Sequence, residues 1–588
     1  MSKLPASLLT TSRAATQTSL AAELALPELT GAAMIVEALI AESVDLVFGY
    51  PGGAIMPVYD ALYDARERLH HVLVRHEQGA VHAAQGYARA SGRVGVCIAT
   101  SGPGATNLVT GIADAQIDST PLVCLTGQVF SKLLGTDAFQ ETDVINVTAP
   151  ITKWNCQVTR VEDIAEAMAK AFFIARTGRP GPVLLDITKD AQVSRGRFSY
   201  QRCTRVRSYV PTAVPSRQAL EAAATLLNQA QRPLIIAGQG VLLSHGEREL
   251  AAIADKTGAP VATTLLGLSC FDTSHPLSVG MVGMHGNYGP NIKTNECDVL
   301  LAVGMRFDDR VTGDLSTYAK QAKVIHIELD AAEINKNVKA EVALHGDAKE
   351  TLAHLLPLIE QRQHEAWLEE FRACDRVEHQ KVIRHEVTPE GDGLRMGEVV
   401  HKISKATHGE ALVVSDVGQH QMAAARYSSF AKTLSHVTSG GLGTMGFGLP
   451  AAIGAKLGAP DRTVVLFVGD GGFQMTLQEL GTLVQTGAAV KIVILNNHYL
   501  GMVRQWQELF FERRYSQTEM TNPDFVQLAS AYGIRGMKVN DRATLESAIP
   551  TMLAHSGAFL LEVSVERESN VFPMVPAAAS VSDVRLEP

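Results

Sequence analysis

Cysteine is scarce in this sequence. Seven cysteines occur among 588 residues, an odd number, and no two of them form a CxxC pair. This pattern argues against a zinc knuckle, which uses such pairs, and against a disulfide framework, which needs cysteines at short spacing. A chain of this kind fits a reducing compartment, so we expect a cytoplasmic location.

Long apolar runs and charge of one dominant sign are also missing. Hydrophobic residues make up 46% of the chain, yet no run reaches the roughly 18 uninterrupted residues that a membrane helix requires. Charged residues make up 19%, and the net charge of −9 is spread along the chain. We therefore expect neither a membrane nor a nucleic acid among the partners.

The N-terminal stretch over residues 1–29 is rich in Ala, Ser, Thr and Leu. It carries Lys3 and Arg13 and has no acidic residue before Glu23. An organellar transit peptide has a similar composition, but a flexible tail is the commoner explanation and the one we adopt.

The remaining chain is too long for a single hydrophobic core and is predicted to form several domains. Short runs of Val, Ile and Leu that end on Gly or polar residues alternate with helical patterns, which is typical of parallel α/β sheets. We predict an α/β fold with three doubly wound parallel-sheet domains. The predicted division after the tail is a first domain (30–190), a linker (191–212), a central domain (213–356), a connector (357–393), a third domain (394–576) and a C-terminal tail (577–588).

Two strand ends in the third domain carry the clearest chemistry. The runs 463–473 (TVVLFVGDGGF) and 491–497 (KIVILNN) begin as apolar strands and stop on polar residues. The carboxyl ends of parallel strands meet at one edge of a sheet, so Asp470 and Asn497 are expected side by side. Carboxylate and amide oxygens suit Mg²⁺, although a Gly-Asp turn and an Asn-Asn loop also occur in ordinary α/β domains. Three glycines would let the backbone approach a phosphate, namely Gly469, Gly471 and Gly472. Residues 475–486, between the strands, have the spacing of a helix, with Leu477, Leu480, Leu483 and Val484 on its apolar face.

Other strand ends carry polar loops that could also be ordinary turns. Glu77, in RHEQ, is followed by small residues that leave room for a flat ring. The loops 101–107 (SGPGATN) and 416–420 (DVGQH) precede helical patterns, where a Gly-rich loop can cradle an anion. In the central domain, RFDDR (306–310) could be a surface charge cluster, but the strands around it predict a nucleotide-binding sheet.

Together, the paired GDG and NN motifs and the runs 439–456 (SGGLGTMGFGLPAAIGAK) and 495–507 (LNNHYLGMVRQWQ) resemble the acetohydroxyacid synthase (acetolactate synthase) family of thiamine diphosphate enzymes. The resemblance extends from about residue 30 to 576. It implies a pyrimidine-binding first domain, a central FAD-binding domain and a diphosphate-binding third domain. It also implies a transferase that decarboxylates pyruvate and joins the two-carbon unit to pyruvate or 2-ketobutyrate, in branched-chain amino acid biosynthesis.

The resemblance assigns roles to individual residues of this chain. Glu77 would bond the aminopyrimidine ring, Gln140 would approach the reacting centre, and Met445 would support the bent cofactor. Arg310 would meet the carboxylate of the second substrate, and Trp506 would cover its pocket. The other thiamine diphosphate contacts would be Pro103, Asn107, Gly418, Gln419, His420, Gly443, Gly469, Gly471 and Gly472. Mg²⁺ would be held by Asp470, Asn497 and Tyr499. FAD would be lined by Thr264, Leu265, Met284, His285, Gly304, Arg306, Asp309, Arg310, Glu328 and Asp347.

The resemblance further implies a homodimer or homotetramer and a separate regulatory small subunit. RFDDR favours the FAD-containing synthases over FAD-free catabolic acetolactate synthases, which remain an alternative together with other thiamine diphosphate carboligases. A non-catalytic paralogue is the third possibility. Three positions depart from the family pattern: Phe130 replaces Pro, Trp154 replaces His, and Gly472 stands where Ser is often found.

Overall fold

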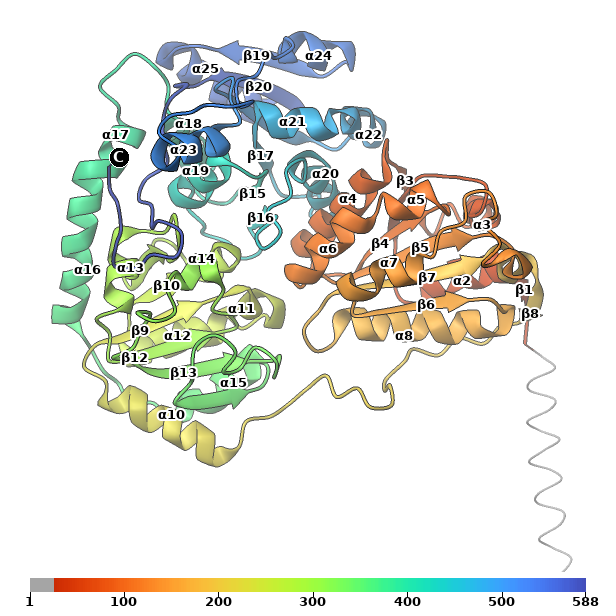
Figure 1. Ribbon diagram of the computed structural model, residues 1–588, viewed down its shortest axis with the longest axis horizontal. Coiled ribbons are helices and arrows are strands. Elements are labelled where there is room, and N and C mark those ends of the chain that lie inside the picture. Colours follow the sequence, from red (N-terminus) through yellow and green to blue (C-terminus); the bar gives the residue numbers. More distant parts are fainter. Residues whose placement is uncertain (1–25, 588) are drawn as a thin grey trace, which may run out of the picture.

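Three six-stranded parallel sheets, each flanked by helices, form the framework of the protein (Figure 1). The computed structural model describes residues 26–587, and the predicted α/β fold with three parallel-sheet domains is confirmed. Residues 1–25, which make up most of the predicted tail, lie outside the described residues. Between residues 26 and 587, no helix has both the length and the apolar character needed to span a membrane.

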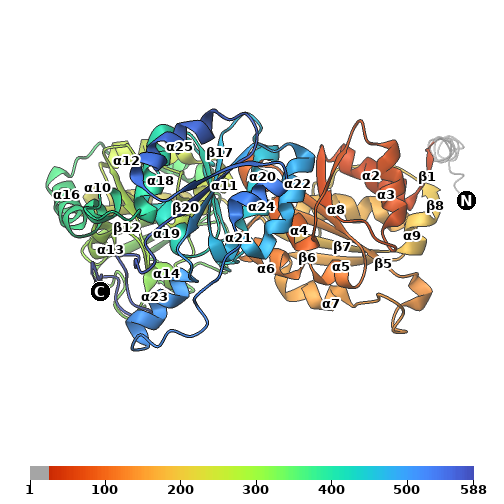
Figure 2. The ribbon, with the colours of Figure 1, turned by 90° about the horizontal axis from the view of Figure 1, so that it is seen from above.

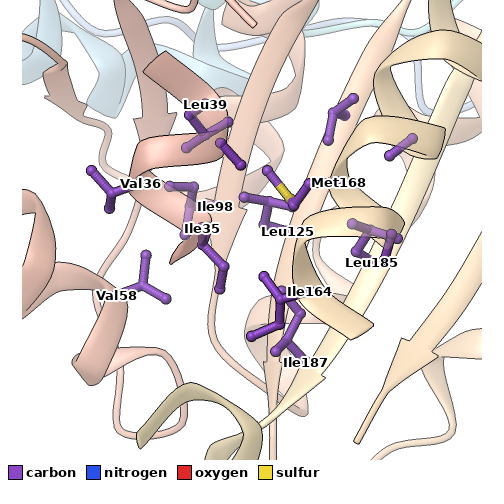
Figure 3. Close-up of a cluster of buried hydrophobic side chains, with 14 of the residues drawn as sticks. Ile35, Val36, Leu39, Val58, Ile98, Leu125, Ile164, Met168, Leu185 and Ile187 are labelled. Carbon is purple, nitrogen blue, oxygen red and sulfur yellow. The ribbon is translucent and has the colours of Figure 1, made fainter. Parts of the chain in front are cut away.

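The first domain has the strand order β3-β2-β4-β5-β7-β6. Its apolar residues alternate between two faces: α2 and α8 cover one face through Ile35, Leu39 and Met168 (Figure 3), and α4 and α6 cover the other. The strands are β2 (Leu46–Gly49), β3 (His70–Leu73), β4 (Gly95–Ala99), β5 (Leu122–Gln128), β6 (Trp154–Val158) and β7 (Pro182–Thr188). The helices are α2 (Gly31–Ala41), α3 (Met56–Asp64), α4 (Glu77–Ser91), α5 (Pro103–Thr106), α6 (Val109–Ile117), α7 (Val144–Thr148), α8 (Ile164–Arg176) and α9 (Lys189–Val193).

A small antiparallel ribbon closes the first domain. Strand β1 (Glu28–Thr30) pairs with β8 (Arg195–Arg197). Strand β1 thus overlaps the stretch predicted as tail, and β8 lies inside the stretch predicted as linker. The chain then crosses to the central domain along the lower edge of Figure 1.

The central domain has the strand order β11-β10-β9-β12-β13-β14. Counted within the domain this is 3-2-1-4-5-6, the order of dinucleotide-binding sheets, with the switch point between β9 and β12. The strands are β9 (Pro233–Ala237), β10 (Val261–Thr263), β11 (Ser278–Met281), β12 (Val299–Val303), β13 (Lys323–Glu328) and β14 (Val342–His345). The helices are α10 (Arg217–Gln229), α11 (Gln239–Ser244), α12 (Glu247–Thr257), α13 (Tyr288–Thr294), α14 (Asp309–Thr312) and α15 (Ala348–Leu355).

The third domain repeats the topology of the first, with the order β16-β15-β17-β18-β20-β19. Its strands are β15 (Leu412–Ser415), β16 (His436–Thr438), β17 (Val464–Gly469), β18 (Val490–Asn496), β19 (Arg535–Val539) and β20 (Phe559–Ser564). Its helices are α18 (Met396–Ala406), α19 (Gln419–Tyr427), α20 (Gly448–Gly458), α21 (Asp470–Thr476), α22 (Leu480–Thr486), α23 (Gly501–Phe510), α24 (Phe525–Ala531) and α25 (Arg542–Ala554).

The continuous helix predicted over 475–486 is wrong. Helix α21 ends at Thr476, a 3₁₀ turn covers Leu477–Glu479, and α22 begins at Leu480. Val484, which the helical pattern assigned to the buried face, is 49% exposed, whereas Glu479 is buried. The break turns this glutamate toward the first domain.

The first and third domains meet where α4 packs on α20, which lie side by side in both views (Figures 1 and 2). Two glycines make this approach possible. A Cβ atom at Gly86 would overlap the carbonyl oxygen of Ala451, and one at Gly454 would overlap that of Ala83. The two helices therefore touch backbone to backbone.

Two segments tie the central and third domains together. Helix α16 (Glu365–Glu378) runs beside the central domain (Figure 1) and continues through a π-helical turn (His379–Ile383) into α17 (Arg384–Val387). The stretch predicted as a C-terminal tail packs on the central domain, because Ser580 bridges to Gly313 and Val581 is buried.

Candidate active site

The first group of predicted residues lies at the carboxyl ends of β17 and β18, which are neighbours in the third sheet. Asp470 and Asn497 line one small cavity there. The Asp470 carboxylate accepts a hydrogen bond from Asn522 at 2.6 Å, and the Asn497 side-chain oxygen accepts one from the Tyr499 backbone at 3.1 Å. Burial raises the pKa of Asp470.

The residues at this edge fit Mg²⁺ better than a metal that needs a full protein cage. Within residues 26–587, no group of three or more His, Cys, Asp or Glu side chains is gathered to hold an ion. One carboxylate and one amide oxygen leave most coordination positions to water and phosphate, as Mg²⁺ prefers. The guanidinium groups of Arg504 and Arg567 lie 5.3 and 4.9 Å from the centre of the Tyr499 ring.

The same cavity fits a diphosphate group. Its lining includes Gly418, Gln419, His420, Met445, Gly469, Gly471, Gly472 and Tyr499. The Nε2 atom of His420 is buried and has no hydrogen-bond partner among the described residues. Burial lowers the pKa of His420 to about 3, opposed by a backbone hydrogen bond at Asp416, so its imidazole is neutral and carries a single N–H.

Asp416, which was not among the predicted site residues, holds this cavity together. Its buried carboxylate accepts backbone N–H groups of Val417, Gly446 and Gly448, at 2.8, 3.1 and 2.7 Å. Burial raises the pKa of Asp416 to about 6. These bonds fold the turn that carries Met445 against the strand end.

Asp416 also accounts for one departure from the family pattern. A Cβ atom at Gly472 would lie 2.5 Å from an Asp416 carboxylate oxygen. Any larger residue at position 472 would therefore have to displace that carboxylate, so glycine is the residue that this arrangement accepts.

The second group lies in the first domain around Glu77, the first residue of α4. The Asn107 amide donates a hydrogen bond to the Glu77 carboxylate at 2.9 Å. Pro103 begins the short helix α5 beside it, and a Cβ atom at Gly104 would lie 3.3 Å from Glu77. Gln140 has a left-handed backbone (φ +59°) and lies against the same loop, because a Cβ atom at Gly102 would contact its carbonyl.

These two groups do not meet within one chain. Glu77, Asn107 and Gln140 are absent from the lining of the cavity that holds Asp470, and from that of the large cavity described next. A catalytic centre that uses both groups would therefore need a second chain to supply one of them.

The third group lines a cavity of about 680 Å³ between the central domain and its two neighbours. The structure brings together here all ten predicted FAD residues: Thr264, Leu265, Met284, His285, Gly304, Arg306, Asp309, Arg310, Glu328 and Asp347. Gly443 and Trp506 line the same cavity from the third domain, so Gly443 lies apart from the other predicted diphosphate contacts.

The large cavity fits a flavin dinucleotide in size and position. Its volume is within the usual range of about 300–1,000 Å³ for ligand pockets. Gly304 follows β12 at the switch point of the sheet, and Gly240 touches it so closely that a Cβ atom there would lie 2.6 Å from the Gly304 Cα. Burial raises the pKa of Glu328 to about 7. Asp347 caps α15 by accepting the Glu350 N–H at 3.1 Å.

Arg310 lies in this cavity beside Met284, and its Nη1 is 3.6 Å from the Met284 sulfur. Trp506 packs on Phe510 with ring centres 5.1 Å apart. Both side chains thus border a space that is also lined by the flavin residues.

Sequence reasoning missed Arg179 of the first domain. Its guanidinium lines the large cavity and forms ion pairs with Asp330 and Glu333 at 3.2 and 3.0 Å. Arg179 lies in a GRPGP turn whose glycines and prolines predict only a loop.

Phe130, another departure from the family pattern, is 38% exposed, and the Lys189 ammonium lies 5.9 Å from its ring. Trp154 begins the edge strand β6.

Comparison with known proteins agrees with this arrangement. Three family models match: the N-terminal TPP binding domain of thiamine pyrophosphate enzymes over 29–147, the central domain over 220–355 and the C-terminal TPP binding domain over 416–563. The acetolactate synthase isozyme 2 large subunit of Escherichia coli is 47% identical over 94% of this chain and 99% of that protein. The acetolactate synthase large subunit of Corynebacterium glutamicum is 46% identical over 95% and 91%. The probable acetolactate synthase large subunit of Methanocaldococcus jannaschii is 43% identical over 95% and 96%. The chain therefore belongs to the thiamine pyrophosphate enzymes and, within them, to the family of acetolactate synthase large subunits.

Proposed function

We propose that the protein is an acetolactate synthase that uses thiamine diphosphate, Mg²⁺ and FAD. It decarboxylates pyruvate and transfers the resulting two-carbon unit to a second pyruvate or to 2-ketobutyrate. This is the first common step in the synthesis of valine, leucine and isoleucine. The observation that carries the proposal is the meeting of Asp470, Asn497 and His420 in one cavity at the ends of β17 and β18. The His420 Nε2 atom has no hydrogen-bond partner among the described residues.

In this proposal the third domain binds the charged end of the cofactor. Asp470, Asn497 and Tyr499 hold Mg²⁺, and Gly418, Gln419 and His420 contact the diphosphate. Met445 packs beneath the rings from the turn that Asp416 fixes. When bound, thiamine diphosphate supplies the electron sink for decarboxylation, and the protein supplies position and exclusion of water.

The first domain supplies the proton-transfer group. Glu77 is partly buried and held by Asn107, so its carboxylate can share a proton with a ring nitrogen rather than lose it to water. Gln140 borders the same loop. Arg310 binds the carboxylate of the second 2-ketoacid, because the planar guanidinium matches a carboxylate, and Trp506 forms the wall above it.

FAD is proposed to have a structural role, since the net reaction includes no redox step. The cavity bordered by Gly304, Glu328 and Asp347 would hold the dinucleotide. The bound flavin would then form one side of the substrate pocket, beside Arg310 and Trp506.

The separation of Glu77 from Asp470 within one chain supports an active site shared between two copies. We therefore propose a homodimer or homotetramer, and activity that falls when the protein is diluted below the dimer dissociation constant. Specific activity unchanged on dilution to monomers would contradict a shared site. The relatives are named large subunits, which supports a separate regulatory small subunit.

The proposal is tested by acetolactate formation from pyruvate with purified protein, leaving out thiamine diphosphate, Mg²⁺ and FAD in turn. Dependence on all three is expected. Activity that is indifferent to FAD would instead indicate a flavin-free synthase. No activity under any condition, including added small subunit, would contradict an enzymatic role.

A further inference from the structure

Glu479 is a buried carboxylate to which the proposed reaction assigns no role. It is 1% exposed and ends the 3₁₀ turn that interrupts the helix between β17 and β18. Both of its carboxylate oxygens accept the backbone N–H of Arg75, at 3.1 and 3.2 Å. A Cβ atom at Gly79 would overlap one of these oxygens. The carboxylate therefore lies against residues 75 and 79, on either side of Glu77.

Glu479 lies where the first and third domains meet, which we call the seam. Burying a carboxylate there costs free energy unless hydrogen bonds compensate it. Desolvation raises the pKa of Glu479, while bonds from Thr482 and from the backbone N–H groups of Arg75 and His76 lower it. The Thr482 hydroxyl donates at 2.6 Å. Unpaired N–H groups at the start of α4 also favour a negative charge nearby. The backbone bonds come from the turn that precedes α4, whereas Thr482 donates from α22 of the third domain.

Other residues of the third domain contact the same turn of the first domain. The Arg75 guanidinium donates to the Gln485 side chain at 2.9 Å, and the Thr482 hydroxyl lies 3.3 Å from the Leu73 carbonyl. The turn that bears Glu77 is thus bound through its backbone to the third domain of its own chain. The Glu77 side chain is fixed separately, by Asn107 of the first domain.

We propose that Glu479 is the positioning residue for Glu77. It fixes the backbone from residue 75 to residue 79, and with it the direction in which the Glu77 carboxylate extends. The inference rests on the proposed function, in which Glu77 exchanges a proton with the cofactor. Because proton transfer needs a heavy-atom distance of about 2.6–3.2 Å, a small shift of this turn is expected to slow the reaction without weakening cofactor binding.

The test compares Glu479→Gln with wild type at saturating pyruvate and cofactors. Gln keeps the volume but can no longer accept hydrogen bonds on two charged oxygens. We expect kcat to fall about tenfold to hundredfold, the size of effect that a displacement of about 1 Å produces. The KM for pyruvate and the Kd for thiamine diphosphate should stay near wild type.

A second readout does not depend on turnover. Exchange of the thiazolium C2 proton of bound cofactor for deuterium, followed by NMR, should slow in Glu479→Gln by the same factor as kcat. In the Glu77→Gln background, Glu479→Gln should cause no further loss, because residues that act through one another are not additive.

The matched control is Glu398→Gln, which alters another buried glutamate of the third domain. Glu398 is 2% exposed and pairs with Arg542, far in sequence from the seam. It should lower stability and leave kcat and exchange unchanged. Gly79→Ala is a second probe of the site, since its Cβ displaces the Glu479 carboxylate while alanine favours the helix. It should also slow exchange.

The possible outcomes separate the two proposals. Wild-type kcat and exchange rates in both Glu479→Gln and Gly79→Ala would overturn the positioning role, as would a loss of stability alone. Additive losses in the double variant with Glu77→Gln would overturn it too. A wild-type protein that exchanges the C2 proton but makes no acetolactate would overturn the proposed function, and the exchange comparison would still decide the role of Glu479.

Discussion

The first and third domains have the same strand order but carry different chemistry at their strand ends. In the third domain, Asp470 and Asn497 lie in a cavity lined by glycines and by His420, whose Nε2 has no partner among the described residues; this lining suits a metal and a diphosphate. In the first domain, Glu77 is paired with an amide and lines neither described site cavity. In the proposed function, the same topology serves cofactor binding in the third domain and proton transfer in the first. The function lies in the strand-end residues rather than in the fold.

The two domains also anchor each other across their seam. Glu479 of the third domain binds the turn before Glu77, as described above. In return, Asp118 of the first domain accepts the backbone N–H groups of Gly440 and Gly441 at 2.8 and 2.7 Å. Asp114 accepts the Thr444 hydroxyl at 3.2 Å. Each domain therefore fixes a site loop of the other through buried carboxylates.

The largest effect is expected for Glu77→Gln, which should lower catalysis without weakening cofactor binding. Glu77→Gln should lower kcat by about 10²–10⁴, the usual contribution of a general acid–base group. Its Kd for thiamine diphosphate and its unfolding midpoint should stay near wild type, because the third domain binds the diphosphate. Steady-state kinetics and a cofactor titration followed by tryptophan fluorescence measure both quantities. Equal turnover in the variant would remove Glu77 from the mechanism.

The reverse result is expected for Asp470→Asn. Loss of the carboxylate should raise the Kd for thiamine diphosphate at fixed Mg²⁺ by at least about tenfold, since even outer-shell changes cost that much in metal affinity. Excess Mg²⁺ should partly restore binding. The exposed Asp461→Asn is the control for charge. If Asp470→Asn bound cofactor as wild type does, the metal role of this strand end would be refuted.

A smaller effect is expected where the two domains touch. Gly86→Ala should lower the free energy of unfolding by about 1–3 kcal/mol, the cost of overpacking, because the added Cβ overlaps the Ala451 carbonyl. Helix propensity alone predicts the opposite sign, a gain of about 1 kcal/mol. Urea unfolding decides between them. Gly391→Ala, which meets nothing within 4 Å, should be neutral.

The smallest effect concerns pH. Burial and the neighbouring Asp114 raise the pKa of Asp118 to about 6, opposed by Arg89 and the N–H groups of Gly440 and Gly441. The folded state therefore holds this proton more tightly than the unfolded state, and its contribution to stability is lost as pH rises through about 6. The difference in unfolding free energy between wild type and Asp118→Asn should fall between pH 4 and pH 7. A difference that rises over this interval would contradict the raised pKa.

The local sequence pattern was sufficient to predict site residues that lie at the ends of strands. Asp470 and Asn497 could be paired from sequence because apolar runs predict parallel strands, whose carboxyl ends meet. The strand ends of the central sheet led to the prediction of a nucleotide site by the same reasoning. The ten flavin residues came from family resemblance, and they do line one cavity.

Contacts between domains could not be predicted from the local sequence pattern. Glu479 falls within a helical periodicity, yet it lies in the break of that helix and accepts the backbone N–H of Arg75, 404 positions away. Arg179 and Asp118 act on residues more than a hundred positions away, with no spacing that links them. Strand β6 (WNCQV) lies at a sheet edge and is mostly half-buried, so it lacks the continuous apolar run that marks the buried strands.

The packing of residues 574–585 on the central domain has a consequence for biosynthesis. Domains of a nascent chain fold as they leave the ribosome, N-terminal first. The central domain emerges complete in its own sheet, but Val581 and the bridge from Ser580 to Gly313 reach it only after the whole third domain has been synthesised. Gly313 directly follows α14, which begins with Asp309 and Arg310. Residues of the third domain that line the large cavity, such as Gly443 and Trp506, and the segment that packs beside Arg310 are therefore all synthesised after the central sheet. Binding of the proposed flavin is accordingly expected only late in translation.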